Sequence, residues 1–267
     1  MDKKLRVAIN GFGRIGRAFF KVALERNDIE IIAINDLGDV HNLAYLLQYD
    51  TVYKVAPFDV HAEIHPASPE GSSGQVSEQY LVIEGETDIR VKVVQEKDPL
   101  NLPWKDMDID VVVESTGLFT SYDKAQAHIK AGAKHVVISA PAKDSVDTTV
   151  LGETILLGVN EEKFGTCNIT SNASCTTNAS SPLIAILDEA IGIEKALLNT
   201  VHAYTASQSI VDSPNKKDFR EGRAGAQNIV PSSTGAAIAV TKAFTKLSGL
   251  FDGMSMRVPV PAGSIVD

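Results

Sequence analysis

The sequence contains few cysteines, few aromatic residues and no excess of basic charge. Among its 267 residues only Cys167 and Cys175 are cysteines, and 6% of the residues are aromatic. Two cysteines cannot build the disulfide framework of a small secreted protein, which favours a reducing, cytoplasmic setting. The formal net charge of -9 disfavours nucleic acid or an anionic membrane as a partner, because both are bound by basic surfaces.

Long apolar runs are also absent. No segment supplies the roughly 18 consecutive apolar residues of a membrane span, and no signal-peptide core precedes the first strand-like run, so a soluble, untargeted protein is expected. Hydrophobic residues at 44% and charged residues at 22% are ordinary for a globular chain. The length suits two domains whose cores need neither disulfides nor a metal ion.

The N-terminal half alternates buried strands with helices. Apolar runs at 5–9 and 29–36 flank a glycine-rich turn and a helical pattern, which predicts a parallel βαβ unit. Two further runs, 108–117 and 133–141, are predicted as buried strands with a helix over 121–132 between them. This alternation predicts an α/β fold with a Rossmann-type doubly wound parallel sheet.

The rest of the chain has a different pattern. Residues 50–100 contain short alternating strands, and the polar segment 65–79 predicts a long surface loop. After about residue 165, helices and alternating strands predict an α+β domain with a mixed sheet. The elements predicted there are a helix after Cys175, a strand over 195–207, a loop over 213–228, a helix over 234–249 and a terminal strand over 256–267.

The segment GFGRIG places Gly11, Gly13 and Gly16 between the first strand and its helix. Such glycines permit the turn, the close approach of a pyrophosphate and tight helix–sheet packing, and helix N–H groups bind the phosphates. Asp36, at the end of the second strand, can accept hydrogen bonds from both ribose hydroxyls and would repel a 2′-phosphate. The spacing predicts NAD rather than NADP; the alternative is a plain glycine turn with Asp36 as a strand-end cap.

Cys175 stands in SNASCTTN, at the start of a helical pattern. A free cysteine is most often a buried small hydrophobe, but the polar neighbours and the first-turn position, where the helix dipole favours a thiolate, indicate a nucleophile. His202, on the next predicted strand, can accept its proton, although a lone histidine is more often a satisfied core residue. Beside a nucleotide site, the pair predicts cysteine attack on a carbonyl, hydride transfer and a thioester.

A series of motifs runs along the whole chain: GFGRIGR, Asn35 with Asp36, ESTG (114–117), SAPAKD (139–144), SNASCTTN, TVHAYT, PSSTGAA and MRVP. Together they resemble the phosphorylating glyceraldehyde-3-phosphate dehydrogenase family. The resemblance implies that Cys175 attacks the aldehyde, that His202 takes the proton, and that the main-chain N–H of Cys175 helps to hold the oxyanion. Inorganic phosphate would then cleave the thioester. The residues implied for NAD are Gly11, Phe12, Gly13, Arg14, Ile15, Gly16, Asp36, Lys97, Thr116 and Ser139.

The resemblance also implies two anion sites. The residues implied for the phosphate of the substrate are Thr205, Arg220 and Arg257. Those implied for the attacking phosphate are Ser174, Thr176, Thr234 and Gly235. Hydroxyls, backbone N–H groups and guanidinium forks bind phosphate without making a protein basic, although each arginine alone would be interpreted as a surface ion pair. Pro214, in a loop expected to approach the cofactor of a neighbouring subunit, fits the NAD-type pattern, and the family implies a homotetramer.

Some features depart from the family pattern. Ala179 stands where the family often has a second cysteine, Cys167 is interpreted as structural, and the stretch 58–80 is longer than usual. Family members continue past Asp267, where they complete the sheet, add a helix and carry an asparagine that holds the nicotinamide carboxamide. We therefore expect a partial sequence, incomplete at the C-terminus, with an NAD-binding domain over 1–174 and a partial catalytic domain over 175–267.

These observations lead to three hypotheses. The first is NAD-dependent oxidation and phosphorylation of glyceraldehyde 3-phosphate in glycolysis and gluconeogenesis, in the cytoplasm, without nucleic acid, membrane or metal. The second is erythrose-4-phosphate dehydrogenase, which would share nearly every motif. The third is a catalytically silent NAD-binding or redox-sensing module that keeps the glycine loop and a reactive thiol.

Overall fold

A computed structural model describes residues 3–66, 77–85 and 87–267. The chain divides into two compact units, one formed by Met1–Glu153 with Cys167–Ser171 and the other by Thr154–Thr166 with Asn172–Asp267. The sequence-based boundary lies at 174/175, so the division by contacts places 154–166 and 172–174 with the second unit.

The first unit is built on a nine-stranded sheet in the order β10-β11-β9-β8-β1-β2-β7-β6-β5. The central pairs, among them β1 with β2, β1 with β8 and β8 with β9, are parallel, and the pairs β5–β6 and β6–β7 are antiparallel. The strands are β1 (Leu5–Asn10), β2 (Ile29–Asn35), β5 (Val60–His65), β6 (Glu78–Ile83), β7 (Ile89–Val94), β8 (Val111–Glu114), β9 (His135–Ile138), β10 (Glu153–Thr154) and β11 (Ile169–Ser171).

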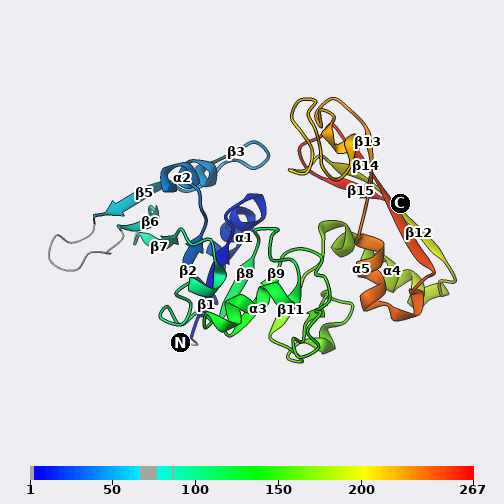
Figure 1. Ribbon diagram of the computed structural model, residues 1–267, viewed down its shortest axis with the longest axis horizontal. Helices are drawn as coiled ribbons and strands as arrows, with labels where there is room; N and C mark the ends of the chain where they lie inside the picture. The colour runs from blue at the N-terminus through cyan, green and yellow to red at the C-terminus, as the bar shows by residue number, and fades with distance from the viewer. Residues whose placement is uncertain (1–2, 67–76, 86) are drawn as a thin grey trace. The chain divides into compact units, whose positions relative to one another are not determined.

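Helices cover both faces of this sheet. Val7 of β1 belongs to a core cluster with Phe20 and Leu47 from two helices, whereas the adjacent Ala8 belongs to a second cluster with Ala125 from a third helix. Because successive strand residues point to opposite faces, the two clusters lie on the two sides of the sheet, as a doubly wound fold requires (Figure 1). The helices are α1 (Arg14–Leu24), α2 (Val40–Gln48) and α3 (Tyr122–Lys130), with a short helix η1 (Pro99–Asn101) and a hairpin of β3 (Tyr49–Asp50) and β4 (Lys54–Val55).

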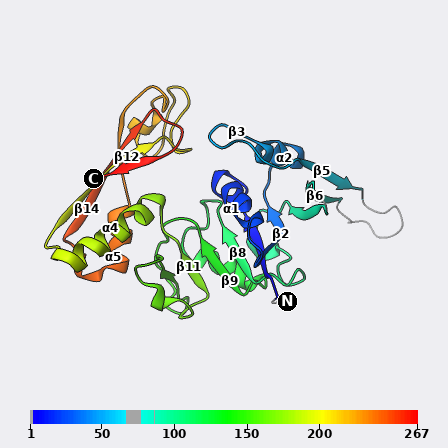
Figure 2. The same ribbon diagram turned by 180° about the vertical axis from the view of Figure 1, so that it is seen from behind.

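The second unit contains a four-stranded mixed sheet in the order β13-β14-β12-β15. Strands β12 and β14 are parallel, and β13 and β15 run antiparallel to their neighbours. Two helices, α4 and α5, pack against each other and lie side by side in Figures 1 and 2. The elements are α4 (Cys175–Ile191), β12 (Ala196–Ala203), β13 (Val230–Ser233), α5 (Ala236–Ala243), β14 (Phe251–Val258) and β15 (Ser264–Val266), with short helices η2 (Glu161–Lys163), η3 (Phe219–Gly222) and η4 (Thr245–Leu247). The predicted pair of sheets, one doubly wound and one mixed, is therefore confirmed.

Several predicted boundaries were wrong. The terminal strand over 256–267 is two strands on opposite sides of β12, because prolines and a glycine with φ of +92°, Gly263, interrupt it. The strand over 108–117 is restricted to β8, since Asp108 and Gly117 have positive φ. The helix over 234–249 ends at Ala243 and continues only as a short 3-10 turn.

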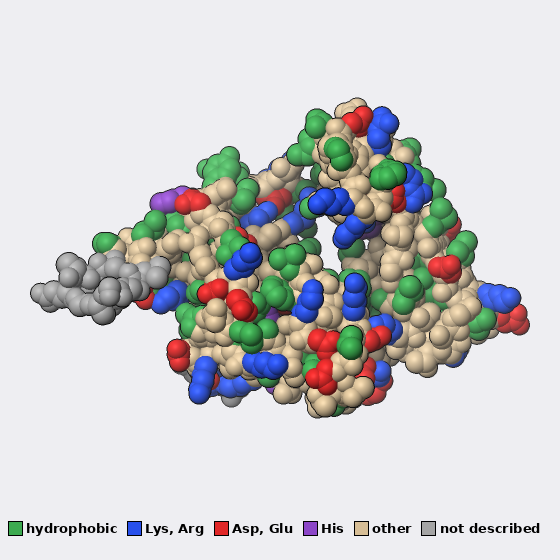
Figure 3. All heavy atoms as spheres, viewed as in Figure 1, with side chains coloured by type: hydrophobic (Ala, Val, Ile, Leu, Met, Phe, Trp, Pro, Cys, Tyr) green, Lys and Arg blue, Asp and Glu red, His purple; other side chains and the backbone are tan. Residues whose placement is uncertain are grey.

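Two expectations concern the surface. The long loop predicted for 65–79 falls mostly on 67–76, outside the described residues. Basic and acidic side chains are both present on the face seen in Figure 3. Within the described ranges, no helix has the length and apolar character needed to cross a membrane.

Candidate active site

Cys175 is the first residue of α4, as predicted. Ser174 precedes it in an extended conformation and caps the helix, because its Oγ accepts a hydrogen bond from the backbone N–H of Thr177 at 3.1 Å. A serine at this position satisfies one of the unpaired N–H groups of the first turn. The thiol is exposed, and it stands where the positive end of the helix dipole stabilises an anion.

The turn before Cys175 has an unusual backbone. Ala173 adopts a φ of +56°, a left-handed conformation that residues other than glycine rarely adopt. Asn178 holds this turn from within the helix, because its Nδ2 donates to the carbonyl oxygen of Asn172 at 2.7 Å and to that of Ser174 at 2.9 Å. The polar residues around the cysteine therefore shape the loop that presents it.

His202 of β12 lies beside the cysteine. Its Nε2 is 3.3 Å from the Sγ of Cys175, so the predicted helix-then-strand arrangement does bring the two side chains together. Its register partner in the parallel strand β14 is Arg257. Sheet pairing thus places a guanidinium next to the imidazole.

Two groups lie within hydrogen-bond distance of Nδ1 of His202. Nδ1 lies 2.7 Å from the carbonyl oxygen of Ala203, and Nη1 of Arg257 lies 2.9 Å from Nδ1 and 3.2 Å from the same carbonyl. The contact with the Ala203 carbonyl requires the hydrogen on Nδ1, whereas the contact with Arg257, whose guanidinium can only donate, requires Nδ1 to accept. In the tautomer with the hydrogen on Nδ1, Arg257 donates to the carbonyl of Ala203 alone, and Nε2 is free to accept the proton of the Cys175 thiol.

A thiol at a helix N-terminus with a correctly oriented imidazole at hydrogen-bond distance is an activated nucleophile. Attack on a carbonyl carbon would place an oxyanion near the first N–H groups of α4, which have no partner within the helix. This part of the site lies wholly within the second unit. It is suited to acyl transfer through a covalent cysteine intermediate.

The predicted phosphate ligands differ in their surroundings. Nε of Arg257 is buried and has no partner among the described residues, which leaves a donor available for an anion. Arg220 instead forms a close pair with Asp218, with Nη2 and Oδ2 2.7 Å apart, and this hydrogen bond raises the pKa of Arg220. Its partner is already a carboxylate of the same loop, so a role in phosphate binding requires Arg220 to leave Asp218.

The remaining predicted anion ligands lie at helix starts and in one loop. Gly235 is the N-cap of α5, and the hydroxyl of Thr234 accepts from the N–H of Ala236 at 3.1 Å. Thr176 is buried in the first turn of α4. Thr205 follows β12, and its hydroxyl lies 3.1 Å from that of Ser207. Two helix N-termini therefore carry predicted anion ligands, in the position where helices bind phosphate.

In the first unit, the glycine loop joins β1 to α1. Gly11 has a φ of +92°, and a Cβ there would lie only 2.6 Å from the backbone nitrogen of Thr116. A Cβ on Gly16 would overlap the carbonyl oxygen of Gly11, whereas one on Gly13 would meet nothing within 4 Å. Gly11 and Gly16 are thus required by packing, and Gly13 leaves room at the helix N-terminus for a ligand to approach the backbone.

Asp36 is tied to the same loop. Its Oδ2 accepts from the N–H of Phe12 at 2.7 Å and its Oδ1 from that of Gly38 at 2.8 Å. Each carboxylate oxygen has a second acceptor site, so ribose hydroxyls can still donate to it. Arg17 donates to the carbonyl oxygen of Phe12 at 2.9 Å, and burial lowers the pKa of this arginine against the opposing effect of Asp50 and Asp36.

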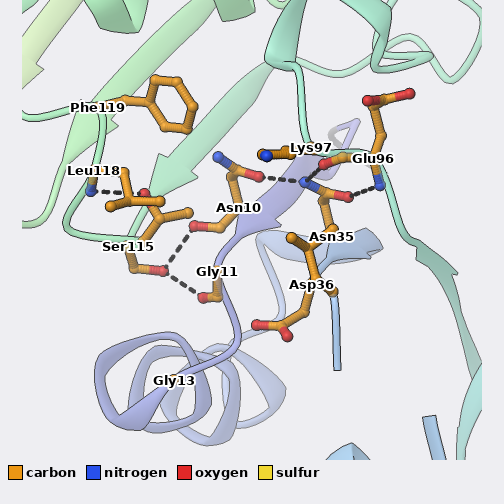
Figure 4. Close-up of a pocket in the computed structure, with 12 residues that line it drawn as sticks. Asn10, Gly11, Gly13, Asn35, Asp36, Glu96, Lys97, Ser115, Leu118 and Phe119 are labelled. Carbon is orange, nitrogen blue, oxygen red and sulfur yellow. Dashed lines mark hydrogen bonds between the residues drawn. The ribbon is translucent and has the colours of Figure 1, made fainter. Parts of the chain in front are cut away.

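A cavity of about 350 Å³ opens beside the loop, at the carboxyl ends of β1, β2 and β8 (Figure 4). Ligands bind at this edge in open α/β sheets. Five predicted cofactor residues line it: Gly11, Gly13, Asp36, Lys97 and Thr116. Sequence reasoning did not assign the other lining residues, which are Asn10, Asn35, Leu37, Glu96, Ser115, Leu118 and Phe119.

The residues present fit a dinucleotide. The space over Gly13 would admit a diphosphate to the N-terminus of α1, and Asp36 supplies the carboxylate for a ribose. Arg14 and Ile15 form the exposed first turn of α1, and Ser139 follows β9 with its hydroxyl donating to the carbonyl oxygen of Glu114 at 3.0 Å. These three residues are near the strand ends but do not line the cavity.

Comparison with known proteins places the two units in one family. Residues 5–122 match the NAD-binding domain of glyceraldehyde 3-phosphate dehydrogenase, and residues 174–267 match its C-terminal domain. Glyceraldehyde-3-phosphate dehydrogenase 2 of Streptomyces avermitilis is 47% identical over 266 residues, covering 98% of this chain and 72% of the relative. Glyceraldehyde-3-phosphate dehydrogenase A of Escherichia coli is 45% identical over 263 residues, with the same two coverages. The enzyme of Mycobacterium avium is 47% identical over 269 residues, covering 98% and 73%.

These matches confirm the NAD-binding unit and the enzyme class predicted from the motifs, while the roles of individual side chains stay predictions. The match begins in β1 and resumes at Ser174, so it includes both the glycine loop and the cysteine with its histidine. The chain therefore belongs to the glyceraldehyde-3-phosphate dehydrogenase family.

Proposed function

We propose that this chain catalyses the NAD-dependent oxidation and phosphorylation of D-glyceraldehyde 3-phosphate to 1,3-bisphosphoglycerate, a step of glycolysis and gluconeogenesis. The observation that carries the proposal is the 3.3 Å contact between Cys175 Sγ and His202 Nε2. It places a nitrogen of the imidazole at hydrogen-bond distance from the nucleophile. The identity of 45–47% with enzymes of this name supports the substrate.

In the first step, Sγ of Cys175 bonds to the aldehyde carbon while Nε2 of His202 takes the thiol proton. The electrons of the carbonyl π bond move to the oxygen, and the backbone N–H of Cys175 stabilises the resulting oxyanion until the imidazolium of His202 returns the proton and the thiohemiacetal forms. His202 then removes the hydroxyl proton as the carbon is oxidised to a thioester. When NAD is bound, it supplies the acceptor for the two electrons and hydrogen lost from that carbon.

Phosphate completes the reaction. Its oxygen attacks the thioester carbon, the C–S bond breaks, and the thiolate of Cys175 leaves as the acyl phosphate forms. Ser174, Thr176, Thr234 and Gly235 are proposed to bind this phosphate, and Thr205, Arg257 and Arg220 the phosphate of the substrate. The residues proposed for NAD are those of the glycine loop (Gly11, Phe12, Gly13, Arg14, Ile15, Gly16) with Asp36, Lys97, Thr116 and Ser139.

The test uses the two cysteines as a matched pair. The wild type and the variant Cys167→Ser should form NADH from glyceraldehyde 3-phosphate, NAD and phosphate, and Cys175→Ser should not. Cys167 is a suitable control because its thiol donates to a local carbonyl, that of Ile169, at 3.2 Å. Labelling of Cys175 by iodoacetate without any NADH burst would instead support a silent NAD-binding module.

Erythrose 4-phosphate should be measured in parallel, because the tetrose-specific enzyme is the nearest alternative. A higher kcat/KM for the triose is expected, and the reverse order would reassign the substrate. The family also implies a homotetramer in the cytoplasm. Native mass spectrometry measures the assembly directly.

A further inference from the structure

A chain of buried polar residues runs beneath the nucleotide cavity in the first unit. Asn10 ends β1, Asn35 ends β2 and Glu114 ends β8, while His128 lies on α3 and Trp104 follows η1. All five are buried, with relative exposures between 0% and 6%. Neither the proposed reaction nor the predicted cofactor residues require them.

Hydrogen bonds connect these five residues in one series. Asn35 Nδ2 donates to Asn10 Oδ1 at 2.6 Å, and Asn10 Nδ2 donates to Glu114 Oε2 at 2.6 Å. The same carboxylate oxygen lies 3.0 Å from His128 Nε2. Nε1 of Trp104 donates to His128 Nδ1 at 3.1 Å.

The series defines where the charge lies. An indole N–H can only donate, so Nδ1 of His128 accepts and the hydrogen of the neutral ring is on Nε2, where it donates to Glu114. Asn10 also donates to Glu114. The arrangement thus fits a neutral imidazole and an ionised carboxylate, a buried charge that is held by hydrogen bonds rather than by a cation.

The other oxygen of Glu114 holds one wall of the cavity. Oε1 accepts from the backbone N–H of Thr116 at 2.8 Å and from its hydroxyl, which in turn accepts from the N–H of Leu118 at 3.0 Å. Thr116 and Leu118 both line the cavity. The carboxylate therefore fixes the turn that follows β8.

The opposite wall is attached to the same series. Asn35 donates to the carbonyl oxygen of Glu96 at 2.9 Å and accepts from its N–H at 2.8 Å. Figure 4 shows Asn10 and Asn35 between Glu96 with Lys97 on one side and Ser115 with Leu118 on the other. Both walls are thus connected to Glu114, one directly and one through the two asparagines.

We propose that Glu114 is a positioning residue for the nucleotide. It acts through Thr116 and Asn10 to keep both walls of the cavity at the spacing that the cofactor needs. Because Trp104 is hydrogen-bonded to His128 and His128 to Glu114, the fluorescence of Trp104 should report a change at this carboxylate. The proposal rests on the proposed function in one respect, that NAD occupies this cavity. It assigns to Glu114 no contact with the cofactor and no part in the chemistry at Cys175.

Glutamine at this position should fail although it has nearly the same shape. Four donors converge on the carboxylate: the N–H and hydroxyl of Thr116, Nδ2 of Asn10 and Nε2 of His128. The amide of Glu114→Gln would point its own N–H groups at two of them. A matched control is Glu30→Gln, because Glu30 is an exposed glutamate near the opposite, amino end of β2.

The experiment measures the dissociation constant of NAD by calorimetry and the emission of Trp104, the one tryptophan of the sequence. Glu114→Gln should raise the dissociation constant at least tenfold and the KM for NAD in parallel, with the KM for the aldehyde and the alkylation rate of Cys175 by iodoacetamide unchanged. Addition of NAD should change the Trp104 emission of the wild type and of Glu30→Gln, and should leave that of Glu114→Gln unchanged. If Glu114 had only a structural role, any loss of the NAD-dependent emission change would be accompanied by a lower melting temperature.

Two results would overturn the proposal. One is a folded Glu114→Gln that binds NAD within twofold of the wild type. The other is a Glu114→Gln variant whose Trp104 emission changes on addition of NAD as much as that of the wild type. If Glu114→Gln does not fold, Thr116→Val decides. It removes the hydroxyl that donates to Glu114 and accepts from the N–H of Leu118, and it should still raise the dissociation constant severalfold, whereas an unchanged value contradicts the proposal. A wild type that binds no NAD would overturn both this proposal and the proposed function, so the two failures are distinguishable.

Discussion

The replacement of His202 by asparagine tests the proposed base at the site of acylation. In the structure Nε2 lies 3.3 Å from the thiol, and Nδ1 is oriented by the carbonyl oxygen of Ala203 at 2.7 Å. Asparagine keeps a polar side chain of similar size but cannot accept and return a proton at neutral pH. The perturbation therefore removes proton transfer and leaves the helix dipole in place.

The expected magnitude follows from the two contributions. A positioned general base typically accelerates a step by about 100- to 10,000-fold, which corresponds to about 3 to 5.5 kcal/mol. The dipole at the N-terminus of α4 contributes only about 0.3–1 kcal/mol to a charge at an exposed position. It cannot replace the base, so the rate of acylation in His202→Asn should fall by at least about 100-fold.

The assay is the burst of NADH on rapid mixing with glyceraldehyde 3-phosphate in the absence of phosphate, when the thioester accumulates. His135→Asn serves as the control because His135 is an exposed histidine on β9, in the first unit. The reasoning is refuted if His202→Asn retains a burst rate within tenfold of the wild type. Equal losses in both histidine variants would point to a general effect on folding instead.

Three further predictions concern the loop, a surface pair and the cysteine turn. Gly13→Ala should not change the melting temperature, because a Cβ there meets nothing within 4 Å, but it should weaken NAD binding by about tenfold, or 1.4 kcal/mol. Gly11→Ala, at φ +92°, should instead lower the free energy of unfolding by about 1–3 kcal/mol in a denaturant titration. The Lys134 ammonium lowers the pKa of Asp110, so Asp110→Asn should cost less than about 1 kcal/mol at neutral pH for this partly exposed pair. A carboxyl group whose pKa is lowered in the folded state stabilises the protein above the pKa of the unfolded state, and this stabilisation is lost as the pH falls through the folded pKa. The difference in unfolding free energy between wild type and variant should therefore disappear as the pH falls below 3.8. Unfolding curves of the two proteins that stay apart in acid would contradict this prediction. Asn178→Ala should slow alkylation of Cys175 and cost about 1–2 kcal/mol, since two carbonyl oxygens of the turn lose a donor; an unchanged alkylation rate would show that the turn holds its shape without it.

Local patterns were sufficient to predict the elements that present the chemistry. The apolar runs of β1 and β2 and the glycines between them encode a βαβ unit within a short stretch of sequence, and Ser174 marks the start of α4 because a serine caps a helix. The histidine was placed on the right strand for the same reason. Periodicity and capping act over a few residues, so a sequence reveals them directly.

Partners that are distant in sequence could not be predicted in this way. Glu114 joins Asn10 and His128, and nothing near any of the three indicates the other two. The sequence contains one local signal of this series, a polar residue at the end of an apolar strand, because Asn10 and Asn35 both end such runs. The division of the terminal strand into β14 and β15 could also have been predicted from the sequence, because Pro259 and Pro261 interrupt the apolar run.

The structure divides the proposed reaction between two groups of residues that belong to different units. Cys175, His202 and Arg257 all lie in the second unit, and the glycine loop, Asp36 and the Glu114 series all lie in the first. The reactivity of the thiol without NAD and the affinity for NAD without aldehyde are therefore separate quantities, each set by local contacts. A change in the affinity for NAD on alkylation of Cys175 is then a coupling free energy between the units, and linkage requires that NAD and a ligand bound reversibly at Cys175 change one another's equilibrium affinity by the same factor. Glu114→Gln should alter the affinity for NAD and leave the reactivity of the thiol unchanged, so it is also the variant in which such a coupling can be measured against an unchanged thiol.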